Sequence, residues 1–134
     1  VRANTVLLAP GGRQMKVDQG SNKLFVRLTD DPQMNRFKPS VDFLFFSLLK
    51  IKDVNIVASL LTGMGNDGAE GLLQLKNAGA HTLVQNQETC AVYGMPRVAI
   101  EMGAACEILA VDAMTKAMVE AVNRGFKKTK PKAS

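Results

Sequence analysis

The sequence predicts an α/β fold in three layers, in which helices cover a mostly parallel sheet and one antiparallel β-hairpin is added. From residue 54 onwards, short apolar runs typical of buried strands alternate with patterns of helical period. Before that, residues 14–28 show the alternation of apolar and polar residues that indicates a hairpin. A single apolar helical pattern after residue 40 connects the two parts. At 134 residues, the chain is long enough to bury one core without cross-links.

The N-terminal third contains three expected strands. Residues 5–9 form a short apolar run that predicts a buried strand, and turn-forming residues end it. Segments 14–18 and 23–28, separated by a polar turn, predict the hairpin. Ser40 is in position to cap the following helix. That helix has apolar residues at helical spacing, namely Val41, Leu44, Phe45, Leu48 and Leu49.

The remaining chain predicts strands and helices in alternation. A strand over 54–61 leads through a glycine-rich turn into a helix over 69–77 and a strand over 80–85. Two strands joined by a helix in this way are expected to be parallel, with a right-handed crossover. A polar loop follows, and the last elements expected are a short helix over 96–102, a strand over 106–111 and a final amphipathic helix.

The net charge of +5 originates at the C-terminal end of the chain. Residues 1–123 contain equal numbers of acidic and basic residues, and the excess comes from Arg124, Lys127, Lys128, Lys130 and Lys132. We expect a domain over 1–123 and a basic, flexible tail over 124–134. Nucleic-acid binding is not expected, because that function needs basic residues spread over a folded face with aromatic residues for stacking. The apolar runs are too short for membrane insertion.

The cysteines and the single histidine give no sign of a metal or cofactor site. Cys90 and Cys106 lack metal-ligand spacing, which predicts reduced thiols in a cytoplasmic protein. His81 lies at the start of an expected strand, away from the glycine-rich turn, and is interpreted as structural.

The glycine-rich turn at residues 63–68 is the most informative segment of the chain. Its glycines permit unusual backbone conformations, and its N–H groups converge before a helix. Such a turn binds a phosphate, stabilises an oxyanion or simply makes a tight connection. The pattern lacks the lysine of a phosphate-binding P-loop, and Glu88 lies in a loop, which disfavours a dinucleotide site. Asp67, at the carboxyl end of a strand, is the first candidate for a functional residue.

Several motifs, in order along the chain, resemble those of the chemotaxis protein-glutamate methylesterases of the CheB type. The resemblance covers residues 5 to about 122. Its strongest part is Leu61-Thr62-Gly63-Met64-Gly65-Asn66-Asp67-Gly68-Ala69. Further parts are Ala9-Pro10-Gly11, Asn35-Arg36-x-x-Pro39-Ser40-Val41-Asp42, Gln85-Asn86-x-x-x-Cys90 and Tyr93-Gly94-Met95-Pro96-Arg97.

The resemblance implies an α/β domain with a Ser-His-Asp triad that hydrolyses glutamate methyl esters on chemoreceptors without a cofactor. Carried over, Asp67 is the triad acid and Met64 offers its backbone N–H to the oxyanion. This chain departs from the family pattern at the histidine, where Gln14 stands in Ala9-Pro10-Gly11-Gly12-Arg13-Gln14-Met15. By the same resemblance, the family serine is expected upstream of Val1, in N-terminal strands of the family fold that this chain lacks.

We therefore expect this chain to be inactive alone, because an amide cannot act as a general base. The alternative interpretation is a non-catalytic chemotaxis or signalling module on the same scaffold. Its expected partners are a methylated chemoreceptor or another chemotaxis protein. Self-association is also expected, because a parallel sheet without its first strands exposes an apolar edge.

Overall fold

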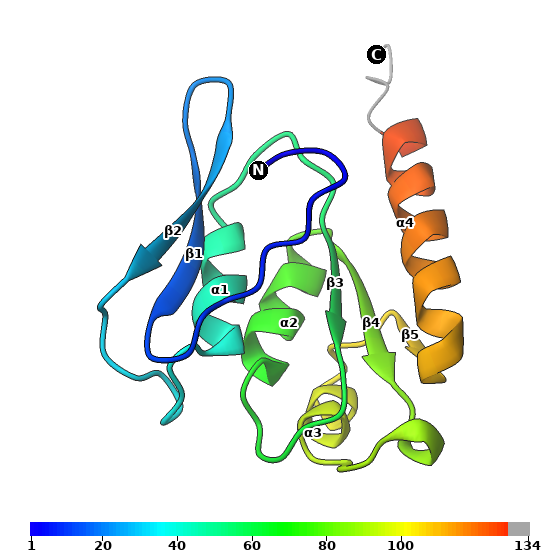
Figure 1. Cartoon of the computed structure of the whole chain (residues 1–134). Coiled ribbons are helices and arrows are strands. Elements are labelled where there is room, and N and C mark those ends of the chain that lie inside the picture. Colours follow the sequence, from blue (N-terminus) through cyan, green and yellow to red (C-terminus); the bar gives the residue numbers. More distant parts are fainter. Residues whose placement is uncertain (129–134) are drawn as a thin grey trace.

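The computed structural model describes residues 1–128, which form four α-helices and five strands in that range (Figure 1). The hairpin and first helix are β1 (Gln14–Gln19), β2 (Leu24–Thr29) and α1 (Val41–Leu48). The central unit is β3 (Val57–Leu60), α2 (Ala69–Asn77) and β4 (His81–Gln85). The C-terminal part contains η1 (Gln87–Thr89), α3 (Met95–Glu101), β5 (Glu107–Leu109), η2 (Val111–Ala113) and α4 (Met114–Lys128).

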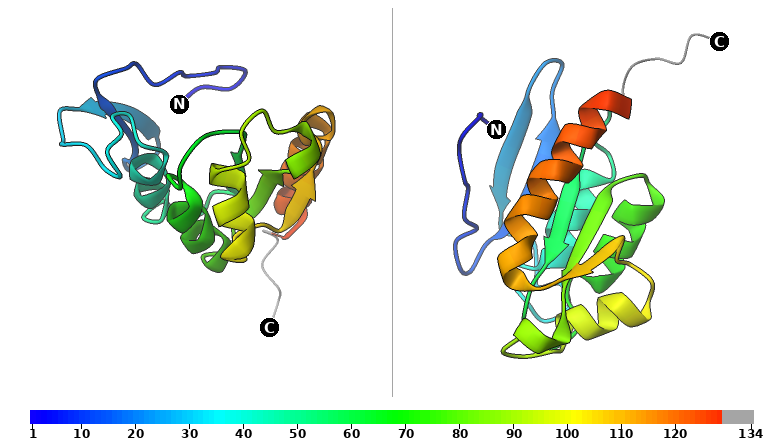
Figure 2. Two further views of the ribbon diagram at one scale, coloured as in Figure 1. Left: turned by 90° about the horizontal axis from the view of Figure 1, so that it is seen from below. Right: turned by 90° about the vertical axis from the view of Figure 1, so that its right-hand side faces the viewer.

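The parallel sheet lies between two layers of helices. β3, β4 and β5 are neighbours in that order, and both pairs are parallel. Successive residues of β4 face opposite sides: Leu83 packs with Met114 and Ala117 of α4, whereas Val84 joins the core that includes residues of α2 and α3. Figure 2 shows α4 on one side of the sheet and the other helices across it. The expected three-layer α/β fold is confirmed.

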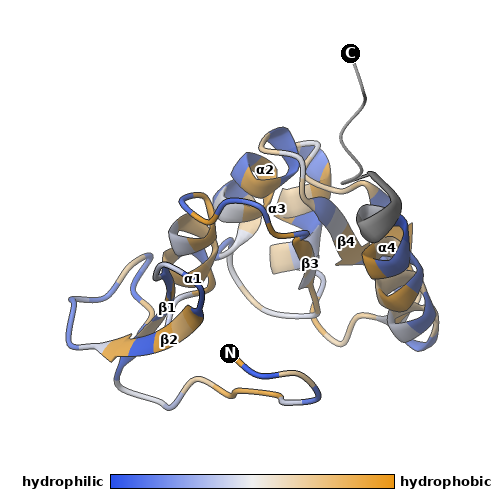
Figure 3. Cartoon of the chain, turned by 90° about the horizontal axis from the view of Figure 1, so that it is seen from above, coloured by the Kyte–Doolittle hydropathy of each residue, from blue (hydrophilic) through white to orange (hydrophobic). Residues whose placement is uncertain are grey.

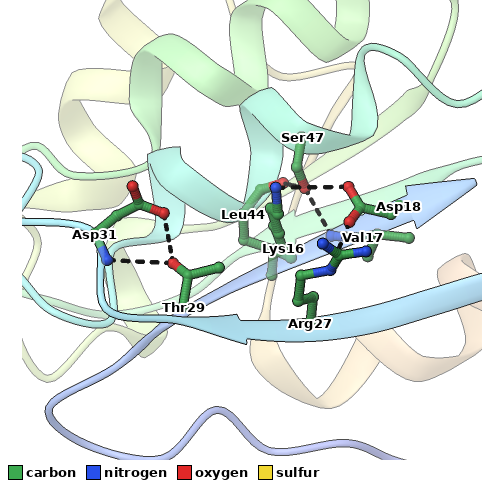
Figure 4. Close-up of polar contacts among 8 residues, drawn as sticks. All are labelled: Lys16, Val17, Asp18, Arg27, Thr29, Asp31, Leu44 and Ser47. Carbon is green, nitrogen blue, oxygen red and sulfur yellow. Dashed lines mark hydrogen bonds and ion pairs between the residues drawn. The ribbon is translucent and has the colours of Figure 1, made fainter.

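The β1–β2 hairpin is also confirmed, with an antiparallel register from Gln14 opposite Thr29 to Gln19 opposite Leu24. Ser47 of α1 joins the hairpin to the rest of the molecule, because its Oγ accepts a hydrogen bond from Val17 N at 3.0 Å (Figure 4). The other side of the hairpin and the N-terminal segment together line a hollow of about 420 Å³. Figure 3 shows apolar stretches in both of these parts.

The strand expected over residues 5–9 does not form, and that prediction is wrong. This segment follows an irregular path (Figure 1), and Val6 and Leu8 are 94% and 92% exposed. An apolar run becomes a strand only where a neighbour pairs with its backbone groups. Within residues 1–128, β3 pairs with β4 alone, and residues 5–9 pair with neither β3 nor any other described strand.

The glycines that bound α2 explain why its ends agree with the prediction. Gly68 precedes the helix with φ of 90° and Gly79 follows it with φ of 100°, a conformation that other residues rarely adopt. α4 continues to Lys128 and so includes the first residues of the expected tail, whereas residues 129–134 lie outside the described range. None of the helices described is long and apolar enough to cross a membrane.

Candidate functional site

Asp67 lies at the end of the glycine-rich turn, and its side chain points into the protein. It is only 3% exposed, and its carboxylate accepts four hydrogen bonds, from two residues of α1, from the N-cap of that helix and from the preceding loop. Oδ2 accepts from Val41 N at 2.7 Å, and Oδ1 accepts from Asp42 N at 3.2 Å. Oδ1 also accepts from Ser40 Oγ at 2.7 Å and from Asn35 Nδ2 at 2.9 Å. The carboxylate therefore satisfies the free N–H groups at the N-terminus of α1, where negative charge is favourable.

Gln14, at the start of β1, is completely buried and has a hydrogen-bond partner on both sides of its amide. Its Nε2 donates to the carbonyl oxygens of Pro32 and Phe37, both at 3.1 Å. Its Oε1 accepts from Ser40 N at 2.8 Å. The amide thus fixes the loop between β2 and α1. A buried polar group without such partners would be costly, and here three backbone groups supply them.

Ser40 brings the two expected site residues together. Its N–H donates to Gln14 and its hydroxyl donates to Asp67, so both side chains contact one residue. Ser40 is also the N-cap of α1, as predicted, and its Oγ accepts from Phe43 N at 3.3 Å. The acid therefore lies beside the position that the family resemblance assigns to a histidine, and is turned away from bulk water.

Asn35 and Asp42 complete the site, and sequence reasoning did not identify them as functional residues. Nδ2 of Asn35 bridges the two carboxylates, donating to Asp42 Oδ2 at 2.7 Å as well as to Asp67. Asp42 Oδ1 accepts from Gly71 N at 2.7 Å, which ties α1 to α2. Both residues belong to the Asn35-to-Asp42 motif in the sequence, so the motif contained the signal. Pairing with Asp67 depends on the tertiary fold and could not be read from the motif.

Burial raises the pKa of the Asp42 carboxyl above its ordinary value of 3.8, outweighing the hydrogen bonds from Gly71 and Asn35. In the pH range from 3.8 up to this raised pKa, the folded state binds more protons than the unfolded state. This group's contribution to the free energy of unfolding therefore falls as pH rises through that range and is constant above it.

We expect urea denaturation across this pH range to detect the titration of Asp42 when the wild type is compared with the Asp42→Asn variant. The asparagine variant cannot titrate at this position. The free energy of unfolding of the variant minus that of the wild type should therefore increase with pH and then level off. A difference that decreases as pH rises would contradict the assignment.

The turn that contains Met64 is fixed by a second loop. Gly63 N donates to Val92 O at 3.1 Å, and Gly63 O accepts from Met95 N at 2.8 Å. Met64 is 78% exposed, and no hydrogen bond among the described residues uses its N–H. A rigid turn with a free N–H is the geometry that an oxyanion donor requires. The role of Met64 itself stays a prediction.

We expect Gly94→Ala to displace this turn. A Cβ at Gly94 would lie 2.7 Å from Gly63 O and 3.0 Å from Gly65 N, and both are backbone atoms that cannot simply rotate away. Overpacking of this kind costs about 1–3 kcal/mol. Thermal denaturation measures the effect, and Gly11→Ala is a suitable control because nothing lies within 4 Å of its Cβ position. Equal melting temperatures for the two variants would contradict this description of the turn.

His81 lies in a different part of the molecule, at the start of β4. Its Nε2 lies 2.6 Å from Glu107 Oε2 at the start of β5, so the two side chains link neighbouring strands. Cys90 and Cys106 are free thiols. The described residues contain no group of three or more histidine, cysteine or acidic side chains that could hold a metal ion.

Comparison with known proteins decides the family. The model of the CheB methylesterase family matches residues 1–118 of this chain. The chain belongs to the CheB methylesterase family. The protein-glutamate methylesterase/protein-glutamine glutaminase of Photorhabdus laumondii is 48% identical over 118 residues, and that of Escherichia coli K12 is 43% identical. Both alignments cover 88% of this chain but only 34% of the relative, so the chain spans about a third of their length.

A solved structure agrees with this assignment. The CheB methylesterase catalytic domain of Thermotoga maritima superposes with a TM-score of 0.81 at 32% sequence identity. The superposition covers 85% of this chain and 60% of the Thermotoga chain. The structural likeness thus confirms that this chain has the α/β fold expected from the family resemblance. The roles of Asp67 and Gln14, like that of Met64, stay predictions.

Proposed function

We propose that this chain forms part of a protein-glutamate methylesterase site of the CheB type and does not hydrolyse esters by itself. It contributes Asp67 as the acid of the triad and Met64 as the backbone donor to the oxyanion. The contact that both Gln14 and Asp67 make with Ser40 supports this proposal most directly. It puts an amide beside the acid, where the family resemblance has an imidazole.

Two properties of the chain explain the proposed lack of activity. The amide of Gln14 cannot accept a proton from a nucleophile and return it to a leaving group near neutral pH. The internal serines are also unsuited to attack: Ser40 caps α1, and Ser47 lies in α1 with its hydroxyl donating to Leu44 O at 2.6 Å. Ser59 is part of β3.

The reaction proposed for the complete site follows the serine-hydrolase sequence. A serine oxygen attacks the ester carbonyl, the base takes the serine proton and methanol leaves with that proton. Water then hydrolyses the acyl-enzyme and releases the glutamate carboxylate. In this scheme Asp67 orients the base, and the N–H of Met64 stabilises the negative oxygen of each tetrahedral intermediate.

Methanol release from methyl-esterified chemoreceptors tests the proposal. The chain alone should give no release above background. The Thermotoga maritima catalytic domain should be active, and the same domain with glutamine in place of its motif histidine should lose most of that activity. Turnover by the chain alone, inhibited by a serine-directed reagent, would overturn the proposal.

A second candidate function is a non-catalytic chemotaxis or signalling module on the same scaffold. The three backbone hydrogen bonds of the buried Gln14 amide favour it, because they give this residue a purely structural task. Co-sedimentation with chemoreceptor membranes distinguishes the two. Binding that is unchanged by Gln14→His and independent of receptor methylation would support the module over the esterase.

We also propose that the chain self-associates or pairs with another polypeptide, and that it acts in the cytoplasm. Residues 5–9 and the free edge of β3 present apolar side chains and unpaired backbone groups, the features that promote strand pairing. We expect the mean mass in light scattering to rise with concentration, and Val6→Lys together with Leu8→Lys to suppress the rise. A strictly monomeric chain at high concentration would contradict this.

A further inference from the structure

Arg36 lies in an unusual turn directly beside the candidate site. The turn spans Met34–Phe37 and is closed by two backbone hydrogen bonds, from Met34 N to Phe37 O at 3.1 Å and from Phe37 N to Met34 O at 2.9 Å. Its two central residues, Asn35 and Arg36, have φ of 53° and 70°. Such angles suit glycine, and two consecutive non-glycine residues hold them only when surrounding contacts impose the conformation.

The side chain of Asn35 supplies those contacts. By donating to both Asp67 and Asp42, it holds the turn against the buried carboxylates. Arg36 follows Asn35 directly in the sequence, so it lies next to the residue whose side chain contacts Asp67, the proposed triad acid. Figure 1 shows the loop between β2 and α1 and the loop between β3 and α2 at the same end of the molecule.

Arg36 and Arg2 are the two described arginines without an ion pair or side-chain hydrogen bond, and of these two only Arg36 lies in the turn beside the candidate site. Four of the six described arginines lie within ion-pair distance of an acidic residue: Arg13 with Asp30, Arg27 with Asp18, Arg97 with Glu101 and Arg124 with Glu107. Arg36 is exposed and takes part in none of the ion pairs or side-chain hydrogen bonds among described residues. A strained backbone thus presents a guanidinium that the fold does not use.

Exposed apolar side chains lie in the turn of Arg36 and in the glycine-rich turn. Phe37 is 43% exposed in the same turn, and Met64 is 78% exposed in the glycine-rich turn that Asn35 reaches through Asp67. A planar guanidinium next to apolar surface suits a polypeptide carboxylate, which it binds through two parallel hydrogen bonds. The charges of residues 1–123 cancel, so the broad positive field that nucleic acid needs is absent from that range.

We propose that Arg36 is a substrate-recognition residue. It binds a carboxylate on an acidic polypeptide segment, and this carboxylate lies near the glutamyl ester that the segment presents to the site. This inference deepens the proposed function and rests on it, because it names the chemistry of the partner at the same site. It predicts a preference for glutamyl residues that have further acidic side chains nearby. The recognition needs no residue of the catalytic machinery and can therefore be measured in the inactive chain.

Fluorescence anisotropy with a labelled, Glu-rich helical peptide tests the inference at low ionic strength. Arg36→Gly is the informative variant, because glycine adopts a φ of 70° without strain while the guanidinium is lost together with its aliphatic stem. We expect it to weaken binding at least about fivefold, and Arg36→Lys to restore part of the affinity. Arg27→Ala removes one positive charge from the hairpin and should change the affinity less than about twofold.

Other outcomes overturn the inference. These are equal effects of Arg36→Gly and Arg27→Ala, equal binding of a peptide with glutamine in place of glutamate, or no binding by the wild-type chain. Displacement of the peptide by millimolar inorganic phosphate would show that the guanidinium prefers phosphate. Because this assay detects binding without turnover, its failure is distinct from a failure to observe methylesterase activity.

Discussion

Asp67→Asn is expected to lower the free energy of unfolding by about 3 kcal/mol, which is large for a single polar substitution. The carboxylate accepts hydrogen bonds from two backbone N–H groups, a hydroxyl and an amide. Asparagine has one acceptor atom, and its NH₂ group would face a donor on one side or the other. Hydrogen bonds to a charged group contribute about 1.5–3 kcal/mol each, and the N-terminus of α1 also loses a favourable negative charge.

Urea denaturation monitored by circular dichroism measures this change, and Glu70→Gln is the matched control. Glu70 lies in the first turn of α2, three residues from Asp67, and its side chain is exposed and accepts from Gln74 Nε2 at 3.0 Å. This substitution should change stability by less than about 0.5 kcal/mol. If both substitutions lower the free energy of unfolding by the same small amount, the hydrogen bonds around Asp67 do not stabilise α1. The result matters for function, because the proposed triad acid would also be a structural residue.

Elements set by local chemistry were predictable from the sequence, and those that need a distant partner were not. The bounds of α2 follow from glycines with positive φ at its two ends, and the hairpin follows from two segments with apolar residues at every second position around a polar turn. Residues 5–9 have an equally clear apolar run, yet no strand forms, because pairing needs a neighbour that local sequence cannot specify.

The same limit applies to the candidate site. Asp67 could be identified because a carboxylate in a glycine-rich turn after a buried strand is unusual in itself. Its contacts with Asn35 and Asp42 join residues that are 32 and 25 positions away, so they depend on how α1 packs on the turn. Arg36 and Arg97 both lie in motifs of the family resemblance, and the structure separates them: Arg97 lies in α3 and pairs with Glu101, whereas Arg36 lies in the turn beside Asp67.

Gln14→His is expected to create esterase activity only in a hybrid that also contains the serine segment. In such a hybrid, the N-terminal part of the Thermotoga maritima catalytic domain, which we propose carries the serine, would be joined ahead of Val1. Loss of a triad base costs serine hydrolases about 10⁴-fold or more, so the histidine hybrid should exceed the glutamine hybrid by at least about 10³-fold in methanol release. Adding Asp67→Asn to the histidine hybrid should remove most of this gain, since the imidazole would then lack its orienting acid.

The gain in activity should be accompanied by a loss of stability, and this pairing makes the prediction specific. Gln14 satisfies two carbonyl oxygens and one N–H, whereas a neutral imidazole has one donor and one acceptor. One buried backbone group is left without a partner, at a cost of about 1–3 kcal/mol. A hybrid that becomes less stable but gains no activity would show that position 14 does not correspond to the family histidine. A hybrid that gains activity without losing stability would show that the Gln14 amide does not fix the loop between β2 and α1.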